Sequence, residues 1–340
     1  MNARKRIPCC FFPTTPLLVD DEQAYLEGLG LRLHNIPKPY TYTNPYIALD
    51  FIENEYHSLF SDRKWQTYLK GISSNTEEFG HPTHSILDFN IFSTYQLIYQ
   101  PDRFKELAVT IADYSMPELN GVDLFSRMTA YPFQKILLTG HATHSIGVEA
   151  FNKGLINQFI EKDLSLNFDE RINAVFKALE YQYFVKLSEN ITHKLIKSSR
   201  SCFGEPVFLE LFHETIQKNN IVEYYLVHES GCFLMLDFEG HPSWFVVKSE
   251  DDMQYYYQSA IDNEAPGVVI DKLKSKNHLL FLFSKTDDED VTYDAWVDYL
   301  HVCKNFVGEK NTFYVSYLKD KSIYDKQLGQ YSSYRDYLMK

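Results

Sequence analysis

The sequence lacks the features that mark secreted, membrane-spanning and zinc-binding proteins. Its 340 residues include only five cysteines, and none has the spacing of a zinc site or a C-x-x-C motif. They are Cys9, Cys10, Cys202, Cys232 and Cys303. No run of about 18 apolar residues is present, so no transmembrane helix and no membrane partner is expected. We therefore expect reduced thiols in a cytoplasmic protein.

Positive charge is also scarce. The chain has 33 lysine and arginine residues against 46 aspartate and glutamate residues, which gives a formal net charge of -13. Binding to nucleic-acid phosphates depends on clustered lysine and arginine, so nucleic-acid binding is not indicated. The length is that of about two domains. The composition thus favours an acidic two-domain protein.

The sequence does contain four short apolar runs, each followed by polar residues. In chain order these polar residues are Asp20 and Asp21, Asp113, Thr139, and Lys162. Each run is typical of a short buried strand, and the carboxyl ends of parallel strands lie along one edge of a sheet. We expect three carboxylates, a hydroxyl and a lysine to meet at this edge. Such a set is suited to one Mg2+ ion and one phosphoryl group.

The four runs, over about residues 13–180, resemble the receiver domain of two-component response regulators. In that family an acidic pair and a later aspartate hold Mg2+, and the later aspartate accepts a phosphoryl group from a histidine kinase or phosphotransfer protein. The resemblance implies that Asp20 and Asp21 are the pair and that Asp113 is the phosphoacceptor. Met116-Pro117 and Gly121 match the residues that usually follow the acceptor.

The resemblance also implies a fold and a switch. The expected fold is an α/β, flavodoxin-like (βα)5 receiver. Thr139 matches the switch hydroxyl, Phe159 the switch aromatic residue, and Lys162 the lysine of the site. Phosphorylation would move Thr139 and Phe159 and so remodel one face of the domain.

The chemistry of the ligands agrees with a magnesium site. Mg2+ takes oxygen ligands and keeps several waters. We expect Asp21 and Asp113 to bind the ion directly, Asp20 through water, and the backbone carbonyl of Ser115 to complete the protein ligands. Taken singly, an aspartate after a strand is more often a helix cap or turn residue, so structural carboxylates remain the alternative.

Two departures from the family pattern stand out. Asp163 follows Lys162, where most receivers have a proline. The stretch between Asp21 and Asp113 is also longer than the family needs, and we interpret about 53–102 as an insertion. The insertion is rich in aromatic residues, which favours a packed segment.

We predict a receiver domain over 1–166, a connecting helix over 167–202 and an α+β output domain over 203–340. Apolar residues spaced by three or four favour one amphipathic helix of nearly the full connecting segment. In the output domain we expect three meander strands joined by turns, then helices, including one near 293–306. Residues 1–12 are expected to be an extension that leads into the first strand.

The output domain carries no helix-turn-helix, Gly-Gly-Asp-Glu-Phe, Glu-Ala-Leu or Walker motif. An acidic run over 287–290 is interpreted as a solvated loop. The domain resembles that of quorum-sensing, LqsR-like response regulators. Our main hypothesis is a phosphorylation-controlled switch that acts by conformational change or homodimerisation, with no separate enzymatic activity evident. Two alternatives remain: a receiver-regulated, nucleotide-handling enzyme, and an interaction module that works without phosphorylation.

Overall fold

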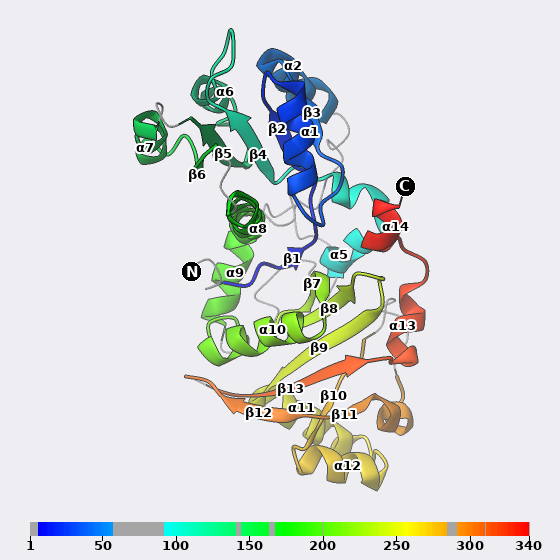
Figure 1. Cartoon of the computed structure of the whole chain (residues 1–340). Helices are drawn as coiled ribbons and strands as arrows, with labels where there is room; N and C mark the ends of the chain where they lie inside the picture. The colour runs from blue at the N-terminus through cyan, green and yellow to red at the C-terminus, as the bar shows by residue number, and fades with distance from the viewer. Residues whose placement is uncertain are drawn as a thin grey trace. The chain divides into compact units, whose positions relative to one another are not determined.

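The computed structural model describes residues 6–56, 92–140, 144–162, 167–198, 200–283, 291–309 and 311–339. Most of the expected insertion, together with Asp163 and the acidic run 287–290, lies outside these residues. The chain divides into two compact units (Figure 1). The parallel-sheet unit comprises Phe12–Thr67, Asp102–Leu187 and Tyr337–Lys340. The antiparallel-sheet unit comprises Met1–Phe11, Tyr68–Pro101 and Ser188–Asp336.

The parallel-sheet unit contains five parallel strands in the order β3-β2-β4-β5-β6. Their bounds are β2 Leu17–Val19, β3 Tyr40–Tyr42, β4 Val109–Asp113, β5 Gln134–Thr139 and β6 Gln158–Glu161. Every residue of β2, β4 and β5 is buried. Burial of the central strands requires helices on both faces of the sheet, as in doubly wound folds. The fold expected for the receiver is confirmed.

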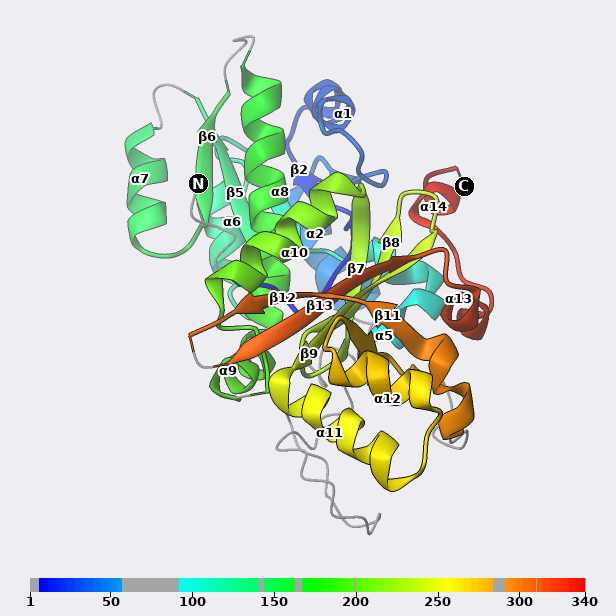
Figure 2. The same cartoon turned by 90° about the horizontal axis from the view of Figure 1, so that it is seen from below.

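Helices cover this sheet on both sides. They are α1 Gln23–Arg32, α2 Pro45–Asp50, α6 Gly121–Arg127, α7 His144–Asn152 and α8 Phe168–Leu187, with a π-helical turn η1 at Phe51–Tyr56. Figure 2 shows α7 and α8 on opposite sides of β5 and β6. On the α8 side, Asn173 accepts the backbone N–H of His34, just beyond α1, at 2.9 Å. This hydrogen bond joins the end of α1 to α8 on the same face of the sheet.

Local capping explains where two of these helices begin. The Asn44 side chain accepts the backbone N–H of Tyr46 at 2.8 Å, and Pro45 occupies the first helical position of α2. The Asn120 side chain accepts the N–H of Asp123 at 2.9 Å at the start of α6. Asparagine caps satisfy N–H groups that have no partner within the helix, and proline costs nothing there.

The expected connecting helix is two helices in the structure. α8 ends at Leu187 and α9 spans Glu189–Lys197, with Ser188 between them at ψ -2°. The Ser188 hydroxyl accepts the backbone N–H of Cys9 at 3.0 Å, and both residues belong to the antiparallel-sheet unit. A tertiary hydrogen bond therefore accompanies the interruption, and apolar spacing along the sequence carries no signal for it.

The antiparallel-sheet unit contains a six-stranded sheet in the order β1-β7-β8-β9-β13-β12. The bounds are β1 Cys10–Phe11, β7 Ile221–His228, β8 Cys232–Asp237, β9 Pro242–Ser249, β12 Lys304–Val307 and β13 Thr312–Lys319. The expected meander is β7, β8 and β9, and the expected α+β class is confirmed. A second, two-stranded sheet pairs β10 His278–Leu280 with β11 Leu300–Val302.

Besides α9, the described helices of this unit are α5 Phe92–Tyr95, α10 Pro206–Lys218, α11 Glu250–Asp262, α12 Gly267–Lys274 and α13 Ser322–Leu328, with 3-10 turns η2 Gln96–Tyr99 and η5 Tyr293–Tyr299. The turn η3 Pro101–Lys105 and the last helix, α14 Tyr334–Leu338, each include residues of both units. The helix expected near 293–306 is wrong: η5 is followed by β11 and β12. Because Trp296 and Leu300 join a buried apolar cluster, tertiary packing overrides the helical pattern there.

Two segments that precede the output region in sequence belong to the antiparallel-sheet unit. In the N-terminal extension, β1 pairs antiparallel with β7, with Phe11 opposite Tyr224. At the end of the expected insertion, the Tyr95 ring lies 5.6 Å from that of Phe283, and the Tyr99 hydroxyl donates to the Leu328 carbonyl at 2.6 Å. These two aromatic residues of the insertion pack, as their composition predicts.

A buried carboxyl group links the chain before β2 to α8. The backbone N–H and the hydroxyl of Thr14 both donate to Glu180 Oε1 at 2.7 Å. Burial raises the pKa of Glu180 to about 7, and the hydrogen bonds from Thr14 offset only part of that rise. A carboxyl group with a raised folded-state pKa favours folding at low pH and loses that contribution as pH rises.

We predict that the parallel-sheet unit loses about 3 kcal/mol of stability as pH rises from about 5 to about 8, because buried Glu180 must then ionise. Glu180→Gln should remove this pH dependence, since the amide oxygen still accepts from Thr14. Thermal unfolding across this pH range measures the difference between the two proteins. Glu170→Gln, at an exposed position of the same helix, is the control. Parallel pH profiles for wild type and Glu180→Gln would contradict the prediction.

Candidate functional site

Three carboxylates converge at the carboxyl edge of the parallel sheet. Asp20 follows β2 and Asp113 ends β4, and the register places Val19 opposite Ala112, so the two aspartates are neighbours. Asp20 and Asp113 are buried, whereas Asp21 is exposed. One oxygen from each of the three residues lies within 4.8 Å of the others. The strand ends therefore bring together the acidic residues that the sequence predicts to meet.

Lys162 neutralises part of this negative charge. Its ammonium lies 2.7 Å from Asp20 Oδ2 and 2.9 Å from Asp113 Oδ1. Its own backbone N–H donates to the carbonyl of Thr139 at 2.8 Å, which anchors the end of β6 beside β5. Burial acts to lower the pKa of Lys162, but the hydrogen bonds with the two aspartates outweigh burial and raise it. The lysine is therefore charged and held between two strand ends.

Backbone N–H groups orient both buried carboxylates. Asp20 Oδ1 accepts the N–H of Glu22 at 3.0 Å, and Asp113 Oδ2 accepts the N–H of Ser115 at 3.1 Å. Each aspartate thus uses one oxygen for its own loop and the other for Lys162. Ser115 lies at the same edge of the sheet, and its carbonyl stays a predicted ligand.

Thr139 ends β5 at the same edge and is completely buried. Its hydroxyl oxygen has no hydrogen-bond partner among the described residues. Leaving a buried hydroxyl unpaired costs free energy, and such groups call for an explanation. The Thr110 hydroxyl is also unpaired in the described part of the chain, but Thr110 lies near the start of β4. Among the described residues, Thr139 alone combines an unpaired hydroxyl with a position at the acidic edge.

Phe159 lies on β6, where the sequence predicts the switch aromatic residue. The ring is half-buried and packs edge-on against His144 of α7, with the ring centres 5.2 Å apart. A β-carbon at Gly147 would lie 3.0 Å from Phe159 Cγ. Glycine on α7 therefore leaves the space that the Phe159 ring occupies.

The loop after Asp113 is tightly closed. The Tyr114 N–H donates to the carbonyl of Leu138 at 2.9 Å, and the Gly121 N–H donates to the carbonyl of Tyr114 at 3.1 Å. A β-carbon at Gly121 would lie 2.3 Å from the Asp113 carbonyl oxygen. Gly121 thus permits the start of α6 to approach the backbone of Asp113, which accounts for the match noted in the sequence.

The donor set fits a magnesium ion. All the candidate ligands are oxygens, which Mg2+ prefers to nitrogen or sulfur. Three carboxylates and one ammonium carry two net negative charges, which a divalent cation balances. Among the described residues, no other group of three histidine, cysteine, aspartate or glutamate side chains has this geometry.

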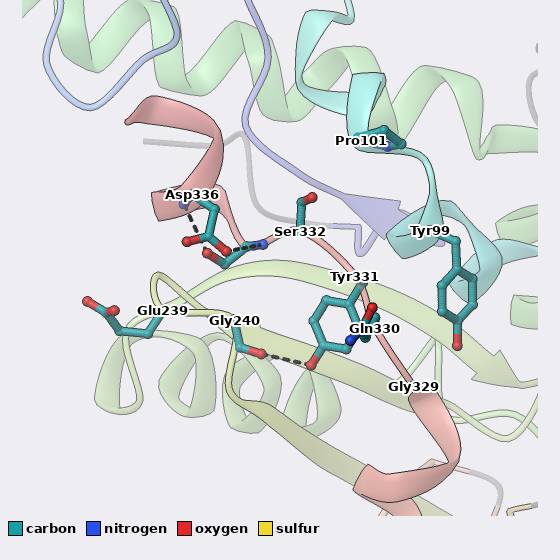
Figure 3. A pocket seen from close by; sticks show the side chains of 10 residues that line it. Tyr99, Pro101, Glu239, Gly240, Gly329, Gln330, Tyr331, Ser332 and Asp336 are labelled. Atoms are coloured by element: carbon teal, nitrogen blue, oxygen red, sulfur yellow. Dashed lines mark hydrogen bonds between the residues drawn. The ribbon is translucent and has the colours of Figure 1, made fainter. Parts of the chain in front are cut away.

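The antiparallel-sheet unit has a hollow of about 610 Å³ (Figure 3). It is lined by Tyr99, Pro101, Glu239, Gly240, Gly329, Gln330, Tyr331, Ser332, Ser333 and Asp336. Its acidic side chains are engaged: Glu239 pairs with Arg335, and Asp336 accepts the N–H of Ser333 at 3.4 Å. The Tyr331 hydroxyl donates to the Gly240 carbonyl at 2.8 Å. The sequence contains no motif that singles out these residues, and the hollow does not gather the convergent carboxylates expected of a nucleotide-handling enzyme.

Two histidines and one tyrosine of the antiparallel-sheet unit have structural roles. His228 is half-buried, its Nδ1 lies 2.8 Å from the Ser230 hydroxyl, and desolvation lowers its pKa to about 3. His241 pairs with Asp237 at 3.1 Å. On α11, Tyr256 packs against the apolar cluster that contains Trp296 and Leu300. These contacts favour turn and core roles over ligand binding.

Comparison with known proteins gives a match along the whole chain. The structure of the Legionella pneumophila response regulator LqsR is 29% identical, with a TM-score of 0.76, and the match covers 98% of this chain and 96% of that one. Transcriptional regulatory protein FixJ of Bradyrhizobium diazoefficiens is 34% identical over 70 residues. That match covers 20% of this chain and 32% of FixJ, so the chain spans about a third of that relative. No family model matches the chain.

A receiver domain protein from Clostridium thermocellum is also similar. It is 17% identical, with a TM-score of 0.31, and the match covers 51% of this chain and 98% of that one.

We predict that Gly121→Ala costs more than about 2 kcal/mol, because the new methyl group would overlap the Asp113 carbonyl and the loop has to open. Gly28→Ala on α1 is the control, since a β-carbon there meets nothing within 4 Å. It should be neutral or stabilising by up to about 1 kcal/mol. Hydrogen exchange of the β4 and α6 amides measures the effect. Unchanged exchange in Gly121→Ala would show that the loop is not closed as described.

Proposed function

Because the chain is a response regulator with a receiver domain in its parallel-sheet unit, we propose that this unit is a Mg2+-dependent phosphoryl acceptor. Asp113 is the residue that accepts the phosphoryl group. The observation that carries the proposal is the charged Lys162, held between Asp20 and Asp113 at the edge where Thr139 presents an unpaired hydroxyl.

Asp20, Asp21, Asp113 and the Ser115 carbonyl would hold the metal. A bound Mg2+ supplies positive charge beside the phosphoryl oxygens, which phosphoryl transfer needs more than covalent chemistry. The rest of the positive charge comes from Lys162. Its contact with Asp113 Oδ1 places the ammonium beside the acceptor, where it can turn to a phosphoryl oxygen after transfer.

The transfer is a nucleophilic displacement at phosphorus. A carboxylate oxygen of Asp113 attacks phosphorus of a phosphohistidine, the P–N bond breaks, and the imidazole nitrogen keeps the electron pair. The product is an acyl phosphate on Asp113. The Thr139 hydroxyl then donates a hydrogen bond to a phosphoryl oxygen and gains the partner that it lacks in the structure.

The switch follows from this hydrogen bond. Movement of Thr139 changes the space beside β5, and Phe159, which packs on α7, follows. This local charge change biases an element that has two arrangements. The readout is a conformational change in the antiparallel-sheet unit or homodimerisation through the remodelled face.

The proposed partners are a histidine kinase or a phosphotransfer protein. Similarity to LqsR along the whole chain supports a signalling role of the same kind, which we propose to be quorum sensing in the cytoplasm. Among the described residues, no helix has the length and apolarity needed to cross a membrane.

We predict that wild-type protein gains one phosphoryl group from acetyl phosphate and Mg2+, and that Asp113→Asn gains none because the amide is a poor nucleophile. Asp271→Asn, at an exposed position of α12, is the matched control and should behave as wild type. Intact mass and solution size are recorded together. A size change in the phosphorylated protein identifies homodimerisation, and an unchanged size identifies coupling within one chain. A phosphoryl group on Asp113→Asn, or none on wild type with any donor, would overturn the proposal in favour of an interaction module.

We also predict that Asp21→Asn weakens Mg2+ binding by about tenfold, or about 1.4 kcal/mol, because the variant loses one negative charge close to the divalent cation. Isothermal titration calorimetry measures the change. Asp50→Asn, at an exposed position of α2, should bind as wild type does. Equal affinities for wild type and Asp21→Asn would remove Asp21 from the ligand set.

A further inference from the structure

The acidic site has a neighbour that neither the motif nor the similarity identifies. Tyr25 lies in the first turn of α1, and the Lys162 ammonium lies 4.2 Å from the centre of its ring. Burial raises the pKa of Tyr25 to about 12, so the phenol is neutral and adds no charge to the site. We propose that Tyr25 is a positioning residue, whose ring holds Lys162 over Asp20 and Asp113.

The geometry of Lys162 supports this role. Its ammonium contacts two carboxylate oxygens, at 2.7 and 2.9 Å, and the Tyr25 ring supplies a further contact. Attraction between a cation and an aromatic face increases as water is removed, and Lys162 is largely buried. The ring thus occupies a side of the ammonium that water would otherwise solvate.

The position of Lys162 in the chain explains why it needs this contact. It directly follows β6, beyond the last ladder pair, Thr139 opposite Glu161. The residue after it is Asp163, so the chain lacks the proline that usually follows the lysine in the receivers it resembles. A long, flexible lysine stem loses rotamer freedom when it is fixed, and the Tyr25 ring offsets part of that cost.

The role of Tyr25 in phosphoryl transfer rests on the proposed function, but its effect on Mg2+ affinity can be measured without phosphoryl transfer. Lys162 contacts Asp20 Oδ2 and Asp113 Oδ1, which are oxygens of the proposed metal ligands. An ammonium held there competes electrostatically with Mg2+. Removing the ring lets the ammonium move away, so Mg2+ should bind more tightly.

We expect Tyr25→Leu to slow phosphorylation by about fivefold, which corresponds to a cation–π contact of about 1 kcal/mol. Leucine is a good helix former, so α1 should persist. Tyr25→Phe keeps the ring and should stay within about twofold of wild type. In a Lys162→Ala background, Tyr25→Leu should cause no further loss, because two residues that act through one contact are not additive.

Wild type, Tyr25→Leu, Tyr25→Phe and Lys162→Ala are also titrated with Mg2+ by calorimetry, without a phosphodonor. Tyr25→Leu should bind Mg2+ several-fold more tightly than wild type, Tyr25→Phe should match wild type, and Lys162→Ala should bind at least as tightly as Tyr25→Leu. If wild type takes no phosphoryl group, the proposed function fails, and these affinities still test the inference. Equal Mg2+ affinities for wild type and Tyr25→Leu would overturn it. So would an equal slowing by Tyr25→Leu with and without Lys162, which would indicate a purely structural role.

Discussion

The site depends on one electrostatic constraint, the need to hold three carboxylates close together at one end of a sheet. Parallel pairing of β2 and β4 places Asp20 beside Asp113, and their mutual repulsion is offset in the structure by Lys162. The backbone N–H groups of Glu22 and Ser115 donate hydrogen bonds to the two buried carboxylates. Since one ammonium balances only one of the three negative charges, two negative charges remain, and a divalent cation would balance them.

The connectivity of the chain gives this site more than one route to the rest of the protein. Within the described ranges, the chain passes from one unit to the other after Phe11, Pro101, Leu187 and Asp336. A five-residue stretch separates β1, in the antiparallel sheet, from β2, which ends next to Asp20. The two units are therefore joined by several covalent connections rather than one linker. The N-terminal extension and the end of the insertion are parts of the antiparallel-sheet unit and not additions to the receiver.

Much of the fold and of the candidate site was predictable because both depend on local patterns. Short apolar runs before Asp20, Asp113 and Thr139 predict buried strands, and the shared direction of parallel strands brings their ends to one edge. The helix expected near 293–306 fails because Trp296 and Leu300 pack in a core cluster with residues from the preceding helices α11 and α12 and strand β10. The single helix expected over 167–202 fails for a similar reason. It is interrupted at Ser188, whose hydroxyl accepts the backbone N–H of Cys9.

The sequence by itself determined which residues gather at the site, since the order and spacing of strand ends is a property of the chain. It also determined the class of both units. Only the tertiary structure decided that β1 pairs with β7, that the Thr139 hydroxyl is left without a partner in the described part of the chain, and that the Tyr25 ring covers Lys162. These features depend on distances between residues that are remote in sequence, and neither periodicity nor propensity records such distances.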